Sequence, residues 1–190
     1  MISLVKGQNV NLSKENPGLT KITVGLGWDA KATGGADFDL DACAFMIGAD
    51  GKVRGDYDFI FYNQLQSSDG SVIHSGDNRT GSGAGDDEQI KVDLSKIPAD
   101  VSRVVFCVSI HEGAERRQNF GQVKNAYIHI INGVDEKELA RYDLSEDASV
   151  ETAMKFAEIY RKDNEWKFKA IGEGTPGGLM VLAKTHGVQI

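Results

Sequence analysis

The sequence predicts an all-β protein, a single-domain β-sandwich over residues 1–190 with a short C-terminal helix. Three observations predict this fold. The dominant hydrophobic period is two, as in half-buried strands. About ten short apolar or alternating runs follow one another at sandwich-like spacing. The chain has 22 glycines, which suit tight turns, and its 41% hydrophobic content over 190 residues is enough for one core.

The predicted strands rest on apolar–polar alternation or on β-branched and aromatic residues. In chain order they are residues 22–26, 38–47, 58–63, 71–75, 89–94, 102–110, 127–131, 138–144, 153–161 and 165–171. Within the second, Asp39 and Asp41 share one face, and Leu40 and Ala42 share the other. The sixth, SRVVFCVSI, is almost wholly apolar, which indicates a central strand covered on both faces.

Two hairpins and one helix complete the prediction. NGVDEK joins the seventh strand to the eighth, and KDN joins the ninth to the tenth. The ninth segment also contains good helix formers, but the hairpin signal favours a strand. A helix is expected within GGLMVLAKTHGV, residues 177–188, where apolar residues recur before the stop signal of Gly187.

Composition excludes several classes of protein. A formal charge of −7 with scattered basic residues argues against nucleic-acid binding. The two cysteines, Cys43 and Cys107, are too few for a disulfide scaffold and are expected to be buried thiols. The first residues lack the apolar stretch of a signal peptide, and the longest apolar run, 104–108, is far too short for a membrane helix. We therefore expect a soluble, cytoplasmic protein without a transmembrane segment.

The acidic residues are concentrated in two segments. Residues 37–41, DFDLD, carry −3, and residues 77–88, DNRTGSGAGDDE, carry another −3, so these segments hold most of the net charge. On a strand, Asp37, Asp39 and Asp41 would point the same way, ~6.7 Å apart, and would repel one another by roughly 0.6 kcal/mol per pair in water. A divalent cation would reverse this repulsion. Solvated carboxylates on an edge strand are the alternative.

The second segment is a glycine-rich loop in which carboxylate, amide and backbone oxygens can converge on one point. Calcium takes six to eight such oxygens. The candidate ligands are Asp77, Asn78, Thr80, Asp86, Asp87 and Glu88. The loop is not an EF-hand, because Arg79, Gly81 and Ser82 stand where that motif needs Asp or Asn and its turn glycine. A solvated glycine-rich loop is the alternative.

The donor types also favour one metal. Zinc prefers His and Cys, and the four histidines show no ligand spacing. Magnesium keeps more water and takes fewer protein ligands. A carboxylate-rich, oxygen-only set fits calcium best.

At these segments the chain resembles the TerD family of tellurite-resistance and stress-response proteins. The motifs that carry the resemblance are VGLGWD (24–29), GGADFDLDACAF (35–46), DFIFYNQ (58–64), SGDNRTGSGAGDDEQI (75–90), NFGQVKNAYIHI (119–130), ARYDLSEDASVETAM (140–154) and GGLMVLAKTHGV (177–188). They span nearly the whole chain in order.

The resemblance implies a compact β-sandwich that binds calcium, commonly two ions, through loops at one end. It places the ligand-bearing segments on Asp37, Asp39, Asp41, Asp77, Asn78, Thr80, Asp86, Asp87 and Glu88. Asp29, after the strand that contains Trp28, and Glu112, just after the central strand, are further candidates. No catalytic activity is expected, and the implied partners are other tellurite-resistance-type proteins, some of them at the inner face of the membrane.

Three function classes follow. The leading one is a non-enzymatic calcium-dependent interaction module. A calcium-dependent membrane-surface binder is the second, although the acidic loop lacks aromatic or basic anchors. A carboxylate-based hydrolase is the third, and it is disfavoured because no aromatic sugar-binding cleft accompanies the acids.

Overall fold

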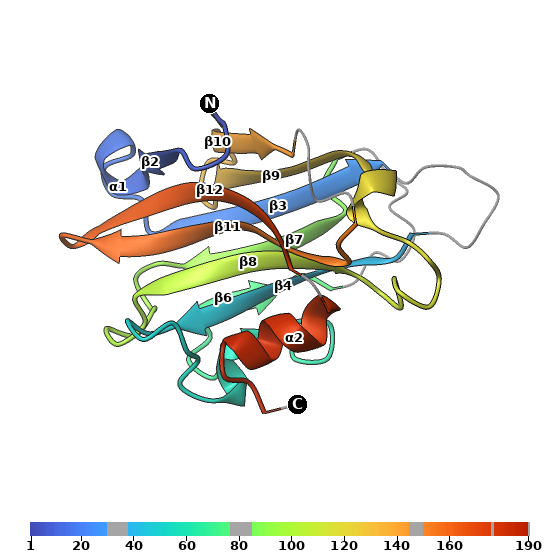
Figure 1. Cartoon of the computed structure of the whole chain (residues 1–190). Coiled ribbons are helices and arrows are strands. Elements are labelled where there is room, and N and C mark those ends of the chain that lie inside the picture. Colours follow the sequence, from blue (N-terminus) through green and yellow to red (C-terminus); the bar gives the residue numbers. More distant parts are fainter. Residues whose placement is uncertain (30–37, 77–84, 145–149, 176, 190) are drawn as a thin grey trace.

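The computed structural model describes residues 1–29, 38–76, 85–144, 150–175 and 177–189. Within these residues, two six-stranded sheets pack face to face, and one eight-residue helix lies on the outer face of the second sheet (Figure 1). Sheet A has the strand order β1-β10-β9-β3-β7-β6, and sheet B has the order β2-β12-β11-β8-β4-β5. No helix in the described part of the chain is long and apolar enough to cross a bilayer.

The strands of sheet A are β1 (Ile2–Leu4), β3 (Lys21–Asp29), β6 (Val72–His74), β7 (Glu88–Asp93), β9 (Lys124–Asn132) and β10 (Glu138–Asp143). The strands of sheet B are β2 (Asn9–Asn11), β4 (Leu40–Ile47), β5 (Phe59–Ile60), β8 (Arg103–Ile110), β11 (Ala153–Lys162) and β12 (Glu165–Thr175). The helices are α1 (Leu12–Glu15), α2 (Gly178–Thr185) and the 3₁₀ turns η1 (Asp56–Asp58) and η2 (Phe120–Gln122).

The predicted all-β sandwich with a C-terminal helix is confirmed. Both predicted hairpins form, as β9–β10 and β11–β12, and the second turns through Asp163 and Asn164 with positive φ angles of 56° and 60°. The segment that could have been helical is strand β11. The prediction over 58–63 is too long, because the chain turns back after Ile60 and the backbone groups of Phe61 and Gln64 bond to each other.

The sequence analysis missed the first three elements, β1, β2 and α1. Each is three or four residues long, too short to show a hydrophobic period. Their backbone pairing comes from distant strands: β1 pairs in parallel with β10, and β2 pairs with β12.

The core lies between the two sheets and extends to the outer face of sheet B. Alternate residues of β8 point inward, such as Phe106 and Val108, while Val105 and Cys107 face outward into a second apolar cluster beneath α2. The prediction of a central strand buried on both faces is therefore confirmed for β8, which lies between β11 and β4.

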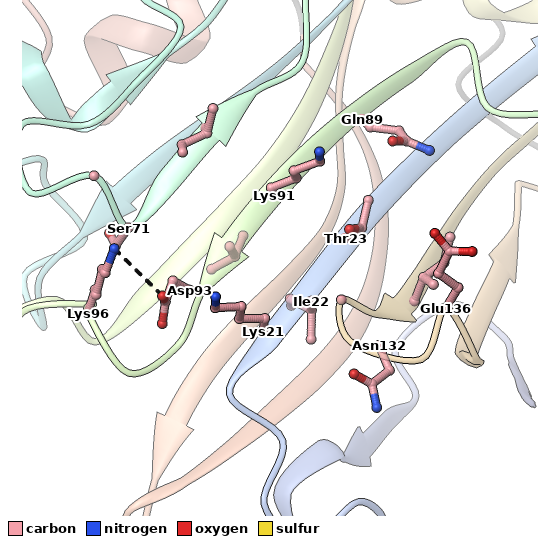
Figure 2. Close-up of a pocket in the computed structure, with 15 residues that line it drawn as sticks. Lys21, Ile22, Thr23, Ser71, Gln89, Lys91, Asp93, Lys96, Asn132 and Glu136 are labelled. Carbon is pink, nitrogen blue, oxygen red and sulfur yellow. Dashed lines mark ion pairs between the residues drawn. The ribbon is translucent and has the colours of Figure 1, made fainter.

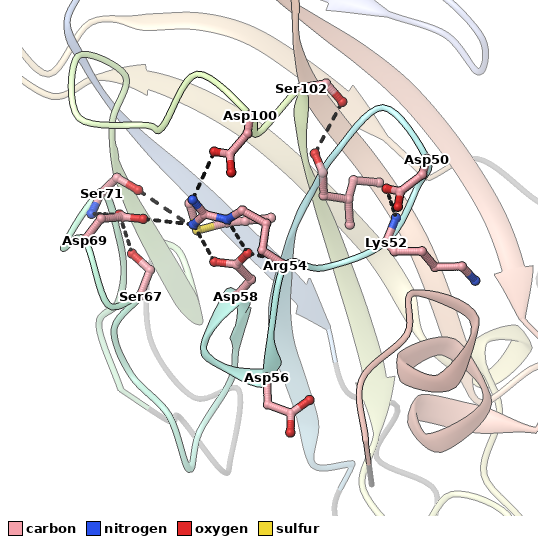
Figure 3. Close-up of polar contacts among 12 residues, drawn as sticks. Asp50, Lys52, Arg54, Asp56, Asp58, Ser67, Asp69, Ser71, Asp100 and Ser102 are labelled. Atoms are coloured by element: carbon pink, nitrogen blue, oxygen red, sulfur yellow. Dashed lines mark hydrogen bonds and ion pairs between the residues drawn. The ribbon is translucent and has the colours of Figure 1, made fainter.

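The end of α2 is held by the turn that follows β4. Lys52 donates from Nζ to the Thr185 carbonyl (2.6 Å), and the Val53 amide donates to the His186 carbonyl (2.9 Å). Next to this turn, the Arg54 guanidinium lies among the carboxylates of Asp58, Asp69 and Asp100 (Figure 3). These contacts fix the position of the helix terminus relative to sheet B.

Candidate functional site

The described parts of the two acidic segments lie at the same end of the sandwich. In sheet A, β7 begins at Glu88, opposite Leu26 near the end of β3. In sheet B, the Asp39 carbonyl, just before β4, accepts from the His111 amide, just after β8 (2.8 Å). The two sheets are joined here because the Ala42 amide donates to Glu88 Oε2 (2.6 Å).

Glu88 takes part in a buried polar bridge between the sheets. His74 Nδ1 accepts from the Gly76 amide (3.0 Å), so in the neutral ring Nε2 carries the proton. Nε2 lies 3.1 Å from the Ala42 carbonyl oxygen and 3.4 Å from Glu88 Oε2. Both side chains are buried, and the bridge satisfies both backbone groups of Ala42.

A first group of carboxylates gathers where β3 ends. The Trp28 amide donates to Asp87 Oδ2 (2.8 Å), and the Asp87 amide donates to the Leu26 carbonyl (2.8 Å). Burial raises the pKa of Asp87, and the nearby negative charges of Asp86 and Asp29 raise it further. Asp87 is therefore a carboxylate that is partly buried beside two other acids.

Asp86 lies on the outer face of sheet A among polar side chains. Tyr127 and Gln89 each donate to its carboxylate (3.0 Å each), and His129 Nε2 lies 2.8 Å from Oδ1. Burial alone would raise the pKa of Asp86, but these partners outweigh it and lower the pKa. On the other side of the ring, His129 Nδ1 lies 2.9 Å from Glu138 Oε1.

Two glycines of β3 make room for this arrangement. A Cβ at Gly25 would overlap the Asp86 carboxylate and the His129 ring, and one at Gly27 would overlap the Tyr127 ring. Sequence reasoning missed the roles of Tyr127 and His129. The available signal was the Gly-x-Gly spacing in VGLGWD, because alternate glycines in a strand indicate a close approach on one face.

A second group of acids lies where β4 begins and β8 ends. His111 Nδ1 is 3.7 Å from Asp41 Oδ2, and its Nε2 is 3.7 Å from Glu112 Oε1. Glu112 also pairs with Arg116 (2.8 Å). Asp39 Oδ1 is buried and has no hydrogen-bond partner among the described residues. A buried carboxylate oxygen of this kind needs a cation, a proton or water.

The structure places Asp41 and Asp86 on opposite faces of the sandwich. Asp41 shares the outer face of sheet B with Cys43, whereas Asp86 lies over the outer face of sheet A. Because packed sheets lie about 10 Å apart, one ion cannot bind both carboxylates. Among the described residues, no three His, Cys, Asp or Glu side chains converge as a complete metal site.

The remaining predicted ligands, Asp37, Asp77, Asn78 and Thr80, lie outside the described residues.

A groove of about 660 Å³ lies away from the acids, on sheet A. It surrounds Lys21 at the opposite end of β3 from Asp29. Lys21 and Lys96 lie near Asp93, and Lys91 lies farther along β7 toward Gln89 (Figure 2). Lys96 Nζ is 3.8 Å from Asp93 Oδ2, so part of its positive charge is already paired. The acidic end and this groove are separate features of the molecule.

Comparison with known proteins assigns the family. The TerD domain family matches residues 1–186. The tellurium resistance protein TerD of Serratia marcescens is 56% identical over 187 residues, which cover 98% of this chain and 97% of that protein. This chain belongs to the TerD family. General stress protein 16U of Bacillus subtilis (strain 168) is 55% identical over 190 residues, covering 100% of this chain and 98% of that protein.

Two solved structures share the fold. A crystal structure of the protein SAV2460, of unknown function, matches with a TM-score of 0.74 at 25% identity, covering 91% of this chain and 99% of that one. A homologue of telluride resistance protein (TerD), SCO6318 from Streptomyces coelicolor A3(2), matches with a TM-score of 0.70 at 25% identity, covering 87% and 96%. The chain is therefore a member of a tellurium-resistance and stress-response family with the two-sheet architecture described above.

Proposed function

We propose that this TerD-family protein is a calcium-binding stress-response module whose metal controls its interactions with other proteins. The observation that carries the proposal is the buried Asp39 Oδ1, which lacks a hydrogen-bond partner in the described part of the chain. The raised pKa of Asp87, which has its cause in burial and in the charges of Asp86 and Asp29, supports it. Both features are relieved by a hard cation.

The two groups of acids suit two ions. Asp29 and Asp87 would serve the first, and Asp39, Asp41 and Glu112 the second. Carboxylate oxygens are the donors that calcium prefers. Asp37, Asp77, Asn78 and Thr80 stay predicted ligands on sequence alone. Asp86 and Glu88 would have a supporting role, because their carboxylates contact other protein groups. Asp86 contacts His129 and Tyr127, and Glu88 accepts from the Ala42 amide.

A bound calcium would neutralise the acidic end and stabilise the fold by mass action. A ligand at about 100 times its Kd contributes about 2.7 kcal/mol, which corresponds to a rise in Tm of roughly 5–10 °C for a chain of this size. Once its negative charge is neutralised, the acidic end no longer repels an acidic partner surface and can bind an acidic or an apolar one. The expected partners are other tellurite-resistance-type proteins.

Thermal unfolding with calcium or with a chelator tests the proposal. We expect calcium to raise Tm, and calorimetry to give two ions per chain. The pair Asp29→Asn and Asp87→Asn should remove one ion, and Asp39→Asn should remove the other. Glu136→Gln, in the loop between β9 and β10, is the control that leaves both ions bound. An unchanged melting curve and no heat of calcium binding would refute the metal proposal.

Liposome co-sedimentation separates the two modes of interaction. A calcium-dependent interaction module stays in the supernatant with anionic vesicles at every calcium concentration. Co-sedimentation that requires calcium would replace the proposed protein partner with a lipid surface.

A further inference from the structure

A second cavity, of about 380 Å³, lies on the outer face of sheet B beside the end of α2. Its walls come from the turn between β1 and β2, from β8, β11 and β12, and from the turn that holds α2. The charged or titratable residues that line it are Lys6, Arg103, Lys155, Glu158, Lys169, Glu173 and His186. It is separate from the acidic end of the sandwich.

The charge of this cavity is opposite to that of the chain. Four cationic side chains and two carboxylates line it, although the whole protein carries a formal charge of −7. The strands bring the charges together: Lys169 is the cross-strand neighbour of Glu158, and Glu158 that of Val105, two positions from Arg103. Among the described residues, Arg103 and Glu158 form a long ion pair of 3.4 Å. The four cations outnumber the two carboxylates around the cavity.

Two buried polar atoms at this cavity lack a hydrogen-bond partner among the described residues: His186 Nε2 and Arg103 Nε. His186 is only 6% exposed, and its Nδ1 lies 3.0 Å from the Gly51 carbonyl oxygen. Because a carbonyl only accepts, Nδ1 is the donor, and Nε2 of the neutral ring is an acceptor. Arg103 Nε is a donor. The cavity thus offers one buried acceptor and one buried donor together with further cations.

The neutral state of His186 has a physical cause. Burial lowers the pKa of His186, and the positive charges of Lys155, Lys52 and Arg103 lower it further, against the opposing effect of the hydrogen bond to Gly51. The contact of Nδ1 with the Gly51 carbonyl orients the ring, and the Lys52 and Val53 contacts hold the end of α2.

We propose that this cavity binds the phosphate group of a small soluble phosphomonoester. A monoprotonated phosphate matches both buried atoms: its P–OH donates to His186 Nε2, and a charged oxygen accepts from Arg103 Nε. Lys155 and Lys169 neutralise the remaining charge. A volume of 380 Å³ lies at the small end of ligand pockets, which suits a small metabolite.

The arrangement also distinguishes phosphate from sulfate. Sulfate has the same shape but no proton near neutral pH, so one of its oxygens would face the His186 lone pair. A site that only attracts negative charge would bind both anions equally. Preference for phosphate is therefore the signature of the buried acceptor.

Two-dimensional NMR titration in metal-free buffer tests the proposal without any role for calcium. The probes are inorganic phosphate, glycerol 3-phosphate and sulfate at matched ionic strength. We expect both phosphates to shift the amide signals of Gly7 and Gly51 saturably at millimolar concentration, and sulfate to bind about tenfold more weakly. Arg103→Gln should weaken phosphate binding by about tenfold.

Lys167 and Lys169 form the matched pair of variants. They lie two residues apart on β12, on the same face, and only Lys169 lines the cavity. Lys169→Gln should weaken phosphate binding several-fold, and Lys167→Gln should leave it unchanged. Equal effects of the two variants, equal binding of sulfate, or no saturable shift with either phosphate would overturn the proposal. Binding to phosphatidic acid vesicles without binding to the free phosphates would also overturn it.

Discussion

The Glu88 carboxylate accepts a hydrogen bond from the backbone amide of Ala42, and this 2.6 Å contact joins β7 of one sheet to β4 of the other. Both residues are buried at the acidic end of the sandwich. The contact explains how a glutamate can begin a strand whose other inward residues, Ile90 and Val92, are apolar. It also places the acids before β4 and those before β7 at the same end of the sandwich.

Replacing Glu88 should therefore reduce stability. Glu88→Ala leaves the buried Ala42 amide without its acceptor, at a cost of about 1–3 kcal/mol in addition to the cavity left behind. Glu88→Gln retains an oxygen acceptor and should lose less. Urea denaturation measures both differences. Equal losses for the two variants would show that the amide contact contributes nothing.

Gly25→Ala should destabilise the protein by about 1–3 kcal/mol, because the new methyl group overlaps the Asp86 carboxylate and the His129 ring. The cost should shrink in an Asp86→Ala background, where one of the overlapping groups is absent. A double-mutant cycle by chemical denaturation measures this coupling. Additive effects would mean that the methyl group is accommodated without contact with Asp86.

His129 should make stability depend on pH. Burial alone would lower its pKa, but the contacts with Asp86 and Glu138 outweigh burial and raise the pKa above 6.5. The stabilisation is therefore complete below pH 6.5 and is lost as the pH rises through the higher folded-state pKa. His129→Gln should cost more at about pH 6 than at about pH 9, as measured by urea unfolding at each pH.

Glu138→Gln gives an independent check on His129. Removing this charge should lower the pKa of His129, which NMR titration of the ring protons measures directly. The pH dependence of stability should weaken in the same variant. A His129 pKa that does not change would mean that Glu138 does not stabilise the protonated ring.

Arg54→Met should destabilise the protein by about 3–5 kcal/mol, because it leaves the Asp58 carboxylate buried without its positively charged partner. Arg54 binds Asp58 through two contacts of 2.7 Å, and Asp58 is 0% exposed. Asp100→Asn is the matched control. The Asp100 side chain is 66% exposed, so its pair with Arg54 should contribute under about 1 kcal/mol. Thermal or urea unfolding distinguishes the two effects.

Much of the fold could be predicted because the strands of this chain carry their own pattern. The face assignment within β4 is confirmed, since Leu40 and Ala42 face the main core and Cys43 faces α2. The hairpin turns were readable from Asn and Gly residues. The pairing of β1 and β2 was not, because partners more than a hundred residues away determine it.

The contacts within the candidate site were harder to predict from the sequence than the strands. Clustered acids predicted where carboxylates gather, but charge alone does not show what each carboxylate contacts. Asp86 stays a predicted ligand, and the sequence did not show that its carboxylate lies among Tyr127, Gln89 and His129. These partners come from β7 and β9, and only the sheet register brings them together.

The apolar cluster beneath α2 contains both cysteines, paired across β4 and β8. Burial raises the pKa of Cys43 well above its usual value, and the neighbouring Cys107, Asp41 and Glu88 raise it further. Thiolate is the reactive form, and both thiols are buried beneath α2. An alkylating reagent therefore reaches these sulfurs only after the helix has detached from the sheet. The rate of thiol labelling thus measures how often the C-terminal helix detaches, and the two native cysteines serve as the probe.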